Sequence, residues 1–353
     1  MLSEILNIHV AITGLSAADN PYPGLGIARS LRYTNEFGGS ISGFVFEPLS
    51  NAAYNNAVFD RIYLVPYPAA GHEALFDRIS EINRKHPVDV IIPALDSEVL
   101  VYTQIEKRLN EIGIRLLLPP VFSVKQSSKN LLYEFGLKHG IVVPETFILN
   151  SAEEIRPRSS DTGIPFLLKG VLSDARICRS VEQGESEYIN LFDLWGYPIL
   201  MQQHIAGEEF DVIALADKNS ETAGALVMKK SGLTDKGKAF AGVTVEHPAL
   251  IEITGKILKC LKWVGPVECE FVCEKESGTP YLIEINSRFP SWLYLAAESG
   301  QNLPLLTLKL ALDIPFESLK SYQTGKLFFR TVTDTELSPV KLMELAAFGE
   351  VHF

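Results

Sequence analysis

The chain has 353 residues, 46% of them hydrophobic, with 32 basic and 43 acidic residues and a net charge of −11. This length is sufficient for two or three domains with hydrophobic cores, whereas the acidic balance and the lack of a basic cluster argue against nucleic acid and membranes as partners. No apolar stretch approaches the ~20 residues that span a bilayer, and the N-terminus lacks a signal-peptide pattern, so we expect a soluble, cytoplasmic protein.

The first third of the sequence alternates short apolar strands with helices. Strands separated by helices in this way are typical of an α/β domain with a parallel, doubly wound, Rossmann-like sheet that is covered on both faces. The expected strands are 7–13, 40–46, 61–65, 88–93 and 115–118, and the expected helices are 24–36, 73–85 and 97–113.

Two segments of this domain follow strands, where open α/β sheets place their ligands. The loop 14–27 contains a G-x-G at Gly24 and Gly26, but its length, its two prolines and the missing third glycine disfavour a dinucleotide site. Asp96 and Glu98 follow the strand 88–93. They either border a substrate cleft or form the acidic first turn of a helix.

From residue 128 the pattern changes to a mixture of helices and longer strands, including one antiparallel pair, 209–216 with 222–229. This mixture is typical of an α+β domain. A further strand is expected after the phrase G-I-V-V-P-E-T, which begins at residue 140. The other expected strands are 165–169, 199–204 and 326–333, and the helices are 129–139, 182–195, 248–261, 292–300, 303–312 and 339–348.

The segment 270–288 predicts a metal site on a β-hairpin. Side chains alternate across a strand, so Glu284 and Asn286 share one face, which Arg288 continues. If residues 277–279 form the turn, Glu270 lies opposite Glu284. Two carboxylates and an amide oxygen are hard ligands that suit Mg²⁺, with Mn²⁺ as an alternative, better than zinc. The competing interpretation is a solvated surface hairpin.

The segment 128–312 resembles the ATP-grasp superfamily, which includes D-alanine ligases, biotin carboxylase and carbamoyl-phosphate synthetase. Lys129, the strand P-F-L-L-K ending at Lys169, I-L-M-Q-Q-H-I-A-G-E-E-F-D-V at 199–212 and Y-L-I-E-I-N-S-R-F at 281–289 carry the resemblance. It implies a pre-ATP-grasp domain at 1–122 and a two-lobed α+β ATP-grasp domain at 123–315. The small lobe would span about 128–203, the large lobe about 204–315, and a strand–helix extension 316–353.

The resemblance also implies an ATP site. Lys129 and Lys169 would contact the α- and β-phosphates, and Glu209 would hold the ribose hydroxyls. A linker between the lobes would read adenine through the backbone of Gln203 and Ile205.

Three more side chains and one departure from the family pattern belong to this expected site. Gln202 would add a side-chain contact to adenine, and Arg288 would bind the transferred phosphoryl group. Lys236 and Lys238 would cover the γ-phosphate, unless their segment is only a mobile charged loop. The turn after Lys169 has a single glycine, where many family members have a glycine-rich loop.

The resemblance implies an ATP-dependent ligase that activates a small-molecule or peptide carboxylate as an acyl phosphate, releases ADP and couples the acyl group to an amine. The alternatives are a carbamoyl-phosphate-type reaction, simple phosphoryl transfer, or a non-catalytic ATP-binding module. The sequence leaves open whether the protein forms a homodimer. It also leaves open the role of the C-terminal segment around Arg330, which either closes the substrate cleft or forms an oligomer interface.

Overall fold

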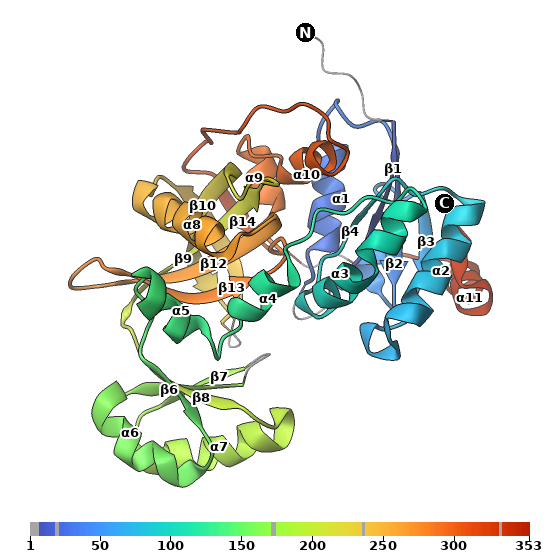
Figure 1. Cartoon of the computed structure of the whole chain (residues 1–353). Coiled ribbons are helices and arrows are strands. Elements are labelled where there is room, and N and C mark those ends of the chain that lie inside the picture. The colour runs from blue at the N-terminus through green and yellow to red at the C-terminus, as the bar shows by residue number, and fades with distance from the viewer. Residues whose placement is uncertain (1–6, 18–20, 171–173, 235–236, 332–333) are drawn as a thin grey trace.

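A computed structural model describes residues 7–17, 21–170, 174–234, 237–331 and 334–353. These residues form three β-sheets (Figure 1). A five-stranded sheet lies in the N-terminal part, a six-stranded sheet lies next to it, and a four-stranded sheet with two helices is set apart from both (Figure 1). None of the helices among the described residues combines the length and the apolarity that crossing a membrane requires.

The N-terminal sheet has the order β15-β3-β2-β1-β4, and β1 to β4 pair in parallel. Alternate side chains face opposite layers: Val10 packs with α1, whereas Ala11 packs with α2 and α3. The predicted parallel sheet covered on both faces is therefore confirmed. Its elements are β1 (His9–Ile12), α1 (Gly24–Arg32), β2 (Ser40–Val45), η1 (Asn51–Tyr54), β3 (Arg61–Leu64), η2 (Pro68–Ala70), α2 (His72–Lys85), β4 (Val90–Ile92) and α3 (Asp96–Glu111).

Two features of this sheet differ from the sequence-based expectation. The strand predicted at 115–118 is wrong: only Arg115 pairs, through a bridge to Val90, because the chain then leaves the sheet edge towards Pro119. At the opposite edge β15 (Glu350–His352), which follows α11 (Pro339–Phe348), pairs antiparallel to β3. The last strand of the chain thus completes the first sheet.

The small sheet has the antiparallel order β5-β8-β6-β7, and α6 and α7 cover one of its faces. Phe166, Leu168 and Met201 pack against these helices. Lys169 and Gln202 occupy the intervening positions and so face away from the helices. The elements are β5 (Thr146–Leu149), η3 (Ala152–Glu154), α6 (Ile155–Thr162), β6 (Phe166–Gly170), β7 (Ala175–Cys178), α7 (Val181–Trp195) and β8 (Ile199–Gln203).

The large sheet has the antiparallel order β13-β12-β9-β10-β11-β14. One face packs on α5 and α8 through residues such as Val212 and Ile257. The elements are α4 (Val121–Gln126), α5 (Leu132–His139), β9 (Gly207–Ala216), β10 (Thr222–Leu233), β11 (Ala239–Val245), α8 (Pro248–Leu261), β12 (Gly265–Glu274), β13 (Pro280–Asn286), α9 (Tyr294–Glu298), α10 (Leu303–Ala311) and β14 (Leu327–Phe329).

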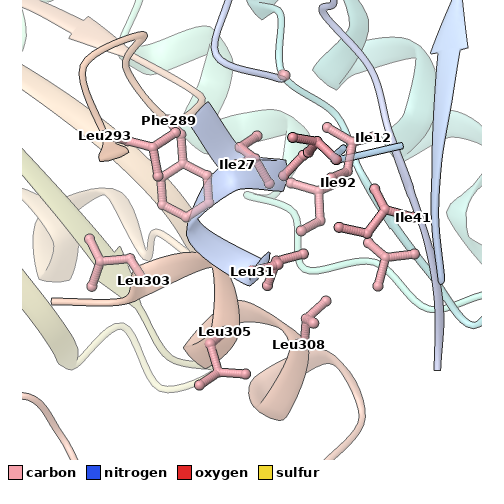
Figure 2. Close-up of a cluster of buried hydrophobic side chains, with 14 of the residues drawn as sticks. Ile12, Ile27, Leu31, Ile41, Ile92, Phe289, Leu293, Leu303, Leu305 and Leu308 are labelled. Carbon is pink, nitrogen blue, oxygen red and sulfur yellow. The ribbon is translucent and has the colours of Figure 1, made fainter. Parts of the chain in front are cut away.

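The other face of the large sheet shares a hydrophobic core with the N-terminal sheet. Ile27 and Leu31 of α1 lie between the strands of that sheet and Phe289, Leu293 and Leu303 (Figure 2). Burial of each such side chain is worth about 1.5–3 kcal/mol. The core therefore fixes the two sheets relative to one another. The domain boundaries expected from the resemblance, 1–122, 123–315 and 316–353, stay a prediction.

Candidate functional site

One face of the large sheet changes from apolar to acidic along its strands. On β9, Ile213 and Leu215 belong to the core shared with the N-terminal sheet, whereas Asp211, two residues earlier on the same face, carries a buried carboxylate. The strand register places Asp211 directly opposite Glu270 on β12, and Glu270 opposite Glu284 on β13. The apolar core thus ends at a row of carboxylates.

The predicted hairpin forms, with Gly278 in the left-handed conformation (φ +71°) at its turn. One carboxylate oxygen from each of Asp211, Glu268 and Glu270 lies within 4.8 Å of the others. We call these three residues the acidic cluster. Of the predicted metal set it contains Glu270 but not Glu284 or Asn286, whose amide nitrogen donates to Glu268 and Glu270.

Lys230 on β10 reaches into the acidic cluster. Its Nζ atom lies 2.8 Å from Glu270, 3.1 Å from Asp211 and 3.2 Å from Glu209, and its side chain is only 5% exposed. Burial acts to lower the pKa of Lys230, but the three carboxylates raise that pKa well above its usual value. Lys230 is therefore charged and neutralises part of the cluster.

The carboxylates of the cluster respond differently to this environment. Burial raises the pKa of Asp211 well above its usual value, and the Lys230 charge only partly opposes this rise. Burial would also raise the pKa of Glu270, but Lys230 and then Lys238 outweigh it and lower that pKa to about 2. The Oδ1 atom of Asp211 is buried, and Lys230 Nζ at 3.1 Å is the cation beside it. Three carboxylates that share one buried ammonium fit a divalent cation bound by oxygen ligands.

Glu268 is held by three donors. Its Oε2 accepts from Arg288 at 2.6 Å and from the Asn286 amide at 3.1 Å, and its Oε1 accepts from the Trp292 indole at 3.0 Å. Asn286 also donates to Glu270 at 3.0 Å. Burial raises the pKa of Glu268 even though Arg288 opposes this shift. These contacts orient two carboxylates of the cluster toward the same point.

Arg288 joins the large sheet to the N-terminal domain. Its Nε lies 3.1 Å from Asp96, whose other oxygen accepts from the backbone N–H of Ser287 at 2.7 Å. Burial would lower the pKa of Arg288, but Asp96 and Glu268 raise it. Of the two predicted cleft residues, Asp96 lines a cavity beside the acidic cluster. Glu98 is instead buried, where its carboxylate accepts from the Thr13 hydroxyl and the Ala94 N–H, and burial raises the pKa of Glu98 to about 7.

The two predicted phosphate lysines lie together near the hairpin. Lys129 Nζ is 3.2 Å from Glu284, and Lys169 is 8% exposed on β6. Burial lowers the pKa of Lys169 to about 8; Glu284 partly counters this effect and Lys129 adds to it. Lys129 itself precedes α5 by three residues, so the helix predicted from 129 begins later than expected, at Leu132.

The predicted adenine and ribose residues lie where the small sheet joins the large one. Gln202 is buried and donates to Thr146 at 2.9 Å, while its Oε1 accepts no hydrogen bond from the described residues. β8 ends at Gln203, Ile205 follows in the linker to β9, and Glu209 near the start of β9 contacts Lys230. Their contacts with a nucleotide stay a prediction.

The acidic cluster, together with Lys230, Glu284 and Arg288, lines a cavity of about 220 Å³. Lys238 is exposed at its edge, just before β11, and the predicted partner Lys236 lies outside the described residues. Arg330, which follows β14, also lines the cavity and donates to the Ala239 carbonyl at 3.1 Å and the Ser291 hydroxyl at 2.9 Å. Burial lowers the pKa of Arg330.

Sequence reasoning missed three residues of this site. Asp211 and Glu268 lie two residues from the predicted Glu209 and Glu270, so strand alternation alone places them on the same face. Lys230 carries no such signal, because its role depends on the pairing of β10 with β9.

Sequence comparisons match this chain to one family profile and to known proteins. A family profile described as "ATP-grasp in the biosynthetic pathway with Ter operon" matches residues 197–331. The carbamoyl phosphate synthase arginine-specific large chain of Geobacillus stearothermophilus is 25% identical over 281 residues, which cover 72% of this chain and 24% of that protein. A D-alanine–D-alanine ligase of Rickettsia felis is 27% identical over 203 residues, covering 52% of this chain and 61% of the ligase. The chain thus spans less than two thirds of either relative.

Solved structures show the same fold. An L-amino acid ligase from Bacillus licheniformis has a TM-score of 0.66 at 19% identity, covering 88% of this chain and 75% of that one. A biotin carboxylase from Campylobacter jejuni, in complex with β,γ-ATP, has a TM-score of 0.71 at 17% identity, with coverage of 91% and 74%. The biotin carboxylase domain of the Hydrogenobacter thermophilus 2-oxoglutarate carboxylase, in complex with MgADP, ADP and bicarbonate, has a TM-score of 0.70 at 17% identity, again covering 91% and 74%.

Proposed function

This chain belongs to the ATP-grasp superfamily, and from that premise we propose that it is an ATP-dependent ligase that couples a carboxylate to an amine. The observation that carries the proposal is one cavity at which the acidic cluster, Lys230, Lys238 and two arginines converge, with Lys129 paired to Glu284 of the cavity wall. Such a site suits a triphosphate, a divalent cation and a second anion at once.

The nucleotide would lie between the small and large sheets. Lys129 and Lys169 would contact its phosphates, and the linker around Gln203 and Ile205 would read adenine. Lys169 supports this placement because a buried lysine with a lowered pKa gains a counter-charge when phosphate binds. Glu209 would leave Lys230 in part to accept hydrogen bonds from the ribose hydroxyls.

The acidic cluster would hold Mg²⁺ through Asp211, Glu268 and Glu270, with Glu284 facing the phosphates. When bound, the ion neutralises charge on the phosphates as the terminal group is transferred. Asn286, Arg288 and Trp292 orient Glu268 and exclude water from its carboxylate.

The arginines would hold the carboxylate substrate. Arg288 is already matched by Asp96 and Glu268, whereas Arg330 contacts only neutral oxygens among the described residues. Arg330 would therefore bind and orient the substrate carboxylate with its two-pronged guanidinium group. Arg288 would stabilise the negative charge of the transferred phosphoryl group.

The chemistry then proceeds in two steps. A carboxylate oxygen attacks the γ-phosphorus, the bond between that phosphorus and the β–γ bridging oxygen breaks, and ADP forms. The amine nitrogen attacks the acyl carbon, the bond to phosphate oxygen breaks, inorganic phosphate leaves and the nitrogen loses a proton to solvent. Positioning of the two anions, with exclusion of water, supplies the rate enhancement.

The decisive experiment separates the first step from the second. Incubation with ATP labelled with ¹⁸O at the β–γ bridge and a pool of carboxylates, without amine, should move label to non-bridging β-positions only when the right acid is present. Addition of amines should then release ADP, phosphate and a product whose mass equals the sum of both substrates minus water. ATP hydrolysis that does not depend on any acid would contradict a ligase, and ATP binding without exchange would indicate a non-catalytic module.

A further inference from the structure

A second cavity, of about 330 Å³, lies at the carboxyl edge of the parallel N-terminal sheet. Its walls come from the segments that directly follow β1 and β2 and from the start of α3. Open α/β sheets bind ligands at this edge, where the strand ends leave a crevice between loops. Tyr22 and Leu95 line this cavity and also line the cavity of about 220 Å³ beside the acidic cluster, which we call the catalytic cavity. The two cavities therefore adjoin, and one molecule can contact both.

Aromatic rings form much of the second cavity. Phe46 and Tyr67 stack with their ring centroids 5.1 Å apart and their planes at 25°. Tyr67 is 52% exposed and Tyr22 is 40% exposed, so ring surface faces water at the cavity mouth. The face of such a ring attracts a cation by about 0.5–2 kcal/mol, depending on how far the cation is removed from water.

The two cavities differ in the sign of the charge that is left without an ion pair. Among the described residues that line the second cavity, Glu47 alone carries a charge, and it forms no ion pair with the described part of the chain. The carboxylates that line the catalytic cavity are paired with Lys129, Lys230 and Arg288, whereas Lys238 and Arg330 line it without an ion pair to any described residue. An anion is therefore favoured beside Lys238 and Arg330, and a cation beside Glu47.

We propose that the second cavity binds a cationic group of the amine co-substrate, between the rings of Tyr67 and Tyr22 and the carboxylate of Glu47. This inference rests on the proposed ligase function and adds the class of the nucleophile: an amine with a second positive charge, such as a basic amino acid or a diamine. The distal cation lies in the second cavity, and the reacting nitrogen extends past Tyr22 and Leu95 to the acyl carbon. A second carboxylate or phosphate is rejected there because it meets Glu47 with no cation beside it.

Calorimetric titration of the full chain with matched probes tests the binding site without requiring turnover. The cationic probes are lysine, arginine and 1,4-diaminobutane, and the controls that lack the distal charge are norleucine, citrulline and butylamine. We expect each cationic probe to bind at least about tenfold more tightly than its control, which corresponds to about 1.4 kcal/mol. Equal affinities within every pair, or no binding of any cationic probe, would overturn the proposal.

Variants assign the effect to the cavity. Glu47→Gln and Tyr67→Ala should each weaken binding of the cationic probes about tenfold and leave the neutral controls unchanged. Glu47→Lys should reverse the preference, so that glutamate binds better than lysine. Glu111→Gln, an exposed carboxylate at the end of α3 and outside the cavity, is the matched control and should have no effect. Unchanged affinity in the Glu47 and Tyr67 variants would refute this location.

The isotope exchange separates this inference from the function on which it rests. Exchange requires ATP and the carboxylate but no amine, so it should persist at the wild-type rate in Glu47→Gln and Tyr67→Ala, while their KM for a cationic amine rises about tenfold. Normal exchange with no preference among amines would refute the amine site alone. Absence of exchange with every acid would refute the ligase, whatever the calorimetry shows.

Discussion

The ammonium nitrogen of Lys230 lies 2.8 Å from a carboxylate oxygen of Glu270, and the Lys230 side chain is almost completely buried. Lys230→Met removes this charge and leaves the carboxylates of Asp211 and Glu270 buried without it. We expect a loss of about 3–5 kcal/mol in the free energy of unfolding, the cost of breaking a buried ion pair from one side. Urea denaturation measures the loss, and millimolar Mg²⁺ should recover part of it, because the ion replaces the missing positive charge.

The neighbouring lysine is the control for this variant. Lys229 pairs with Glu208 at 2.5 Å, but both side chains are largely accessible to solvent, 35% and 61% exposed. Lys229→Met should change the free energy of unfolding by no more than about 1 kcal/mol, as for other exposed ion pairs. Equal losses in the two variants would show that Lys230 is not the centre of the cluster.

Glu284→Gln tests the hairpin carboxylate that the sequence predicted. Its side chain contacts Lys129 from the edge of the cavity and is 27% exposed, so the fold should tolerate the change. We expect ADP release to fall by about 10²-fold or more, because a ligand that positions phosphate and metal is lost. Glu274→Gln, at the far end of the same hairpin, should retain wild-type turnover. A fully active Glu284→Gln enzyme would remove this residue from the site.

Nucleotide affinity should depend on pH through Lys169, whose pKa burial lowers to about 8. Below pH 8 the ammonium is charged and attracts phosphate; as pH rises through 8 it loses its proton, and ATP affinity should fall by up to tenfold per pH unit. In the protein without ATP, raising the pH over this range has the opposite effect on the free energy of unfolding. Between pH 8 and the unfolded pKa near 10.4, the unfolded chain binds more protons, so the free energy of unfolding should rise with pH.

Equilibrium titration with ATP between pH 7 and 9.5 measures this dependence. Lys169→Arg keeps its charge throughout the range and should give a flat profile, whereas Lys169→Gln should be both flat and weak. A pH dependence that survives in Lys169→Arg would assign the effect to another group.

Arg330→Gln tests the proposed carboxylate contact. The Arg330 guanidinium donates only to the Ala239 carbonyl and the Ser291 hydroxyl among the described residues, so its charge is available to a substrate. We expect the KM for the carboxylate to rise about 10- to 100-fold, the loss of one charge-assisted pair, with the KM for ATP unchanged. Lys326→Gln, an exposed residue just before β14, is the matched control. Parallel increases in both KM values would argue for a general structural role.

Local patterns account for the features that the sequence predicted well. Pro248 at the first helical position and Lys262 after the last turn delimit α8 at its predicted ends, and the turn at Gly278 sets the register of the hairpin. These signals act within a few residues. They do not by themselves place Glu270 opposite Glu284: the register that leaves the turn pairs Phe271 with Leu282, and a one-residue shift between Phe271 and Glu270 brings Glu270 opposite Glu284.

The sequence by itself determined the alternation of elements, the parallel N-terminal sheet and the acidic face of the hairpin, since periodicity and turn chemistry are local properties of the chain. Only the tertiary structure decided that Lys230 lies within the acidic cluster, that Arg330 lines the cavity and that β15 completes the first sheet. Each of these depends on contacts between segments that are far apart in sequence. Such contacts arise from the competition of whole surfaces for burial, and no local pattern records its outcome.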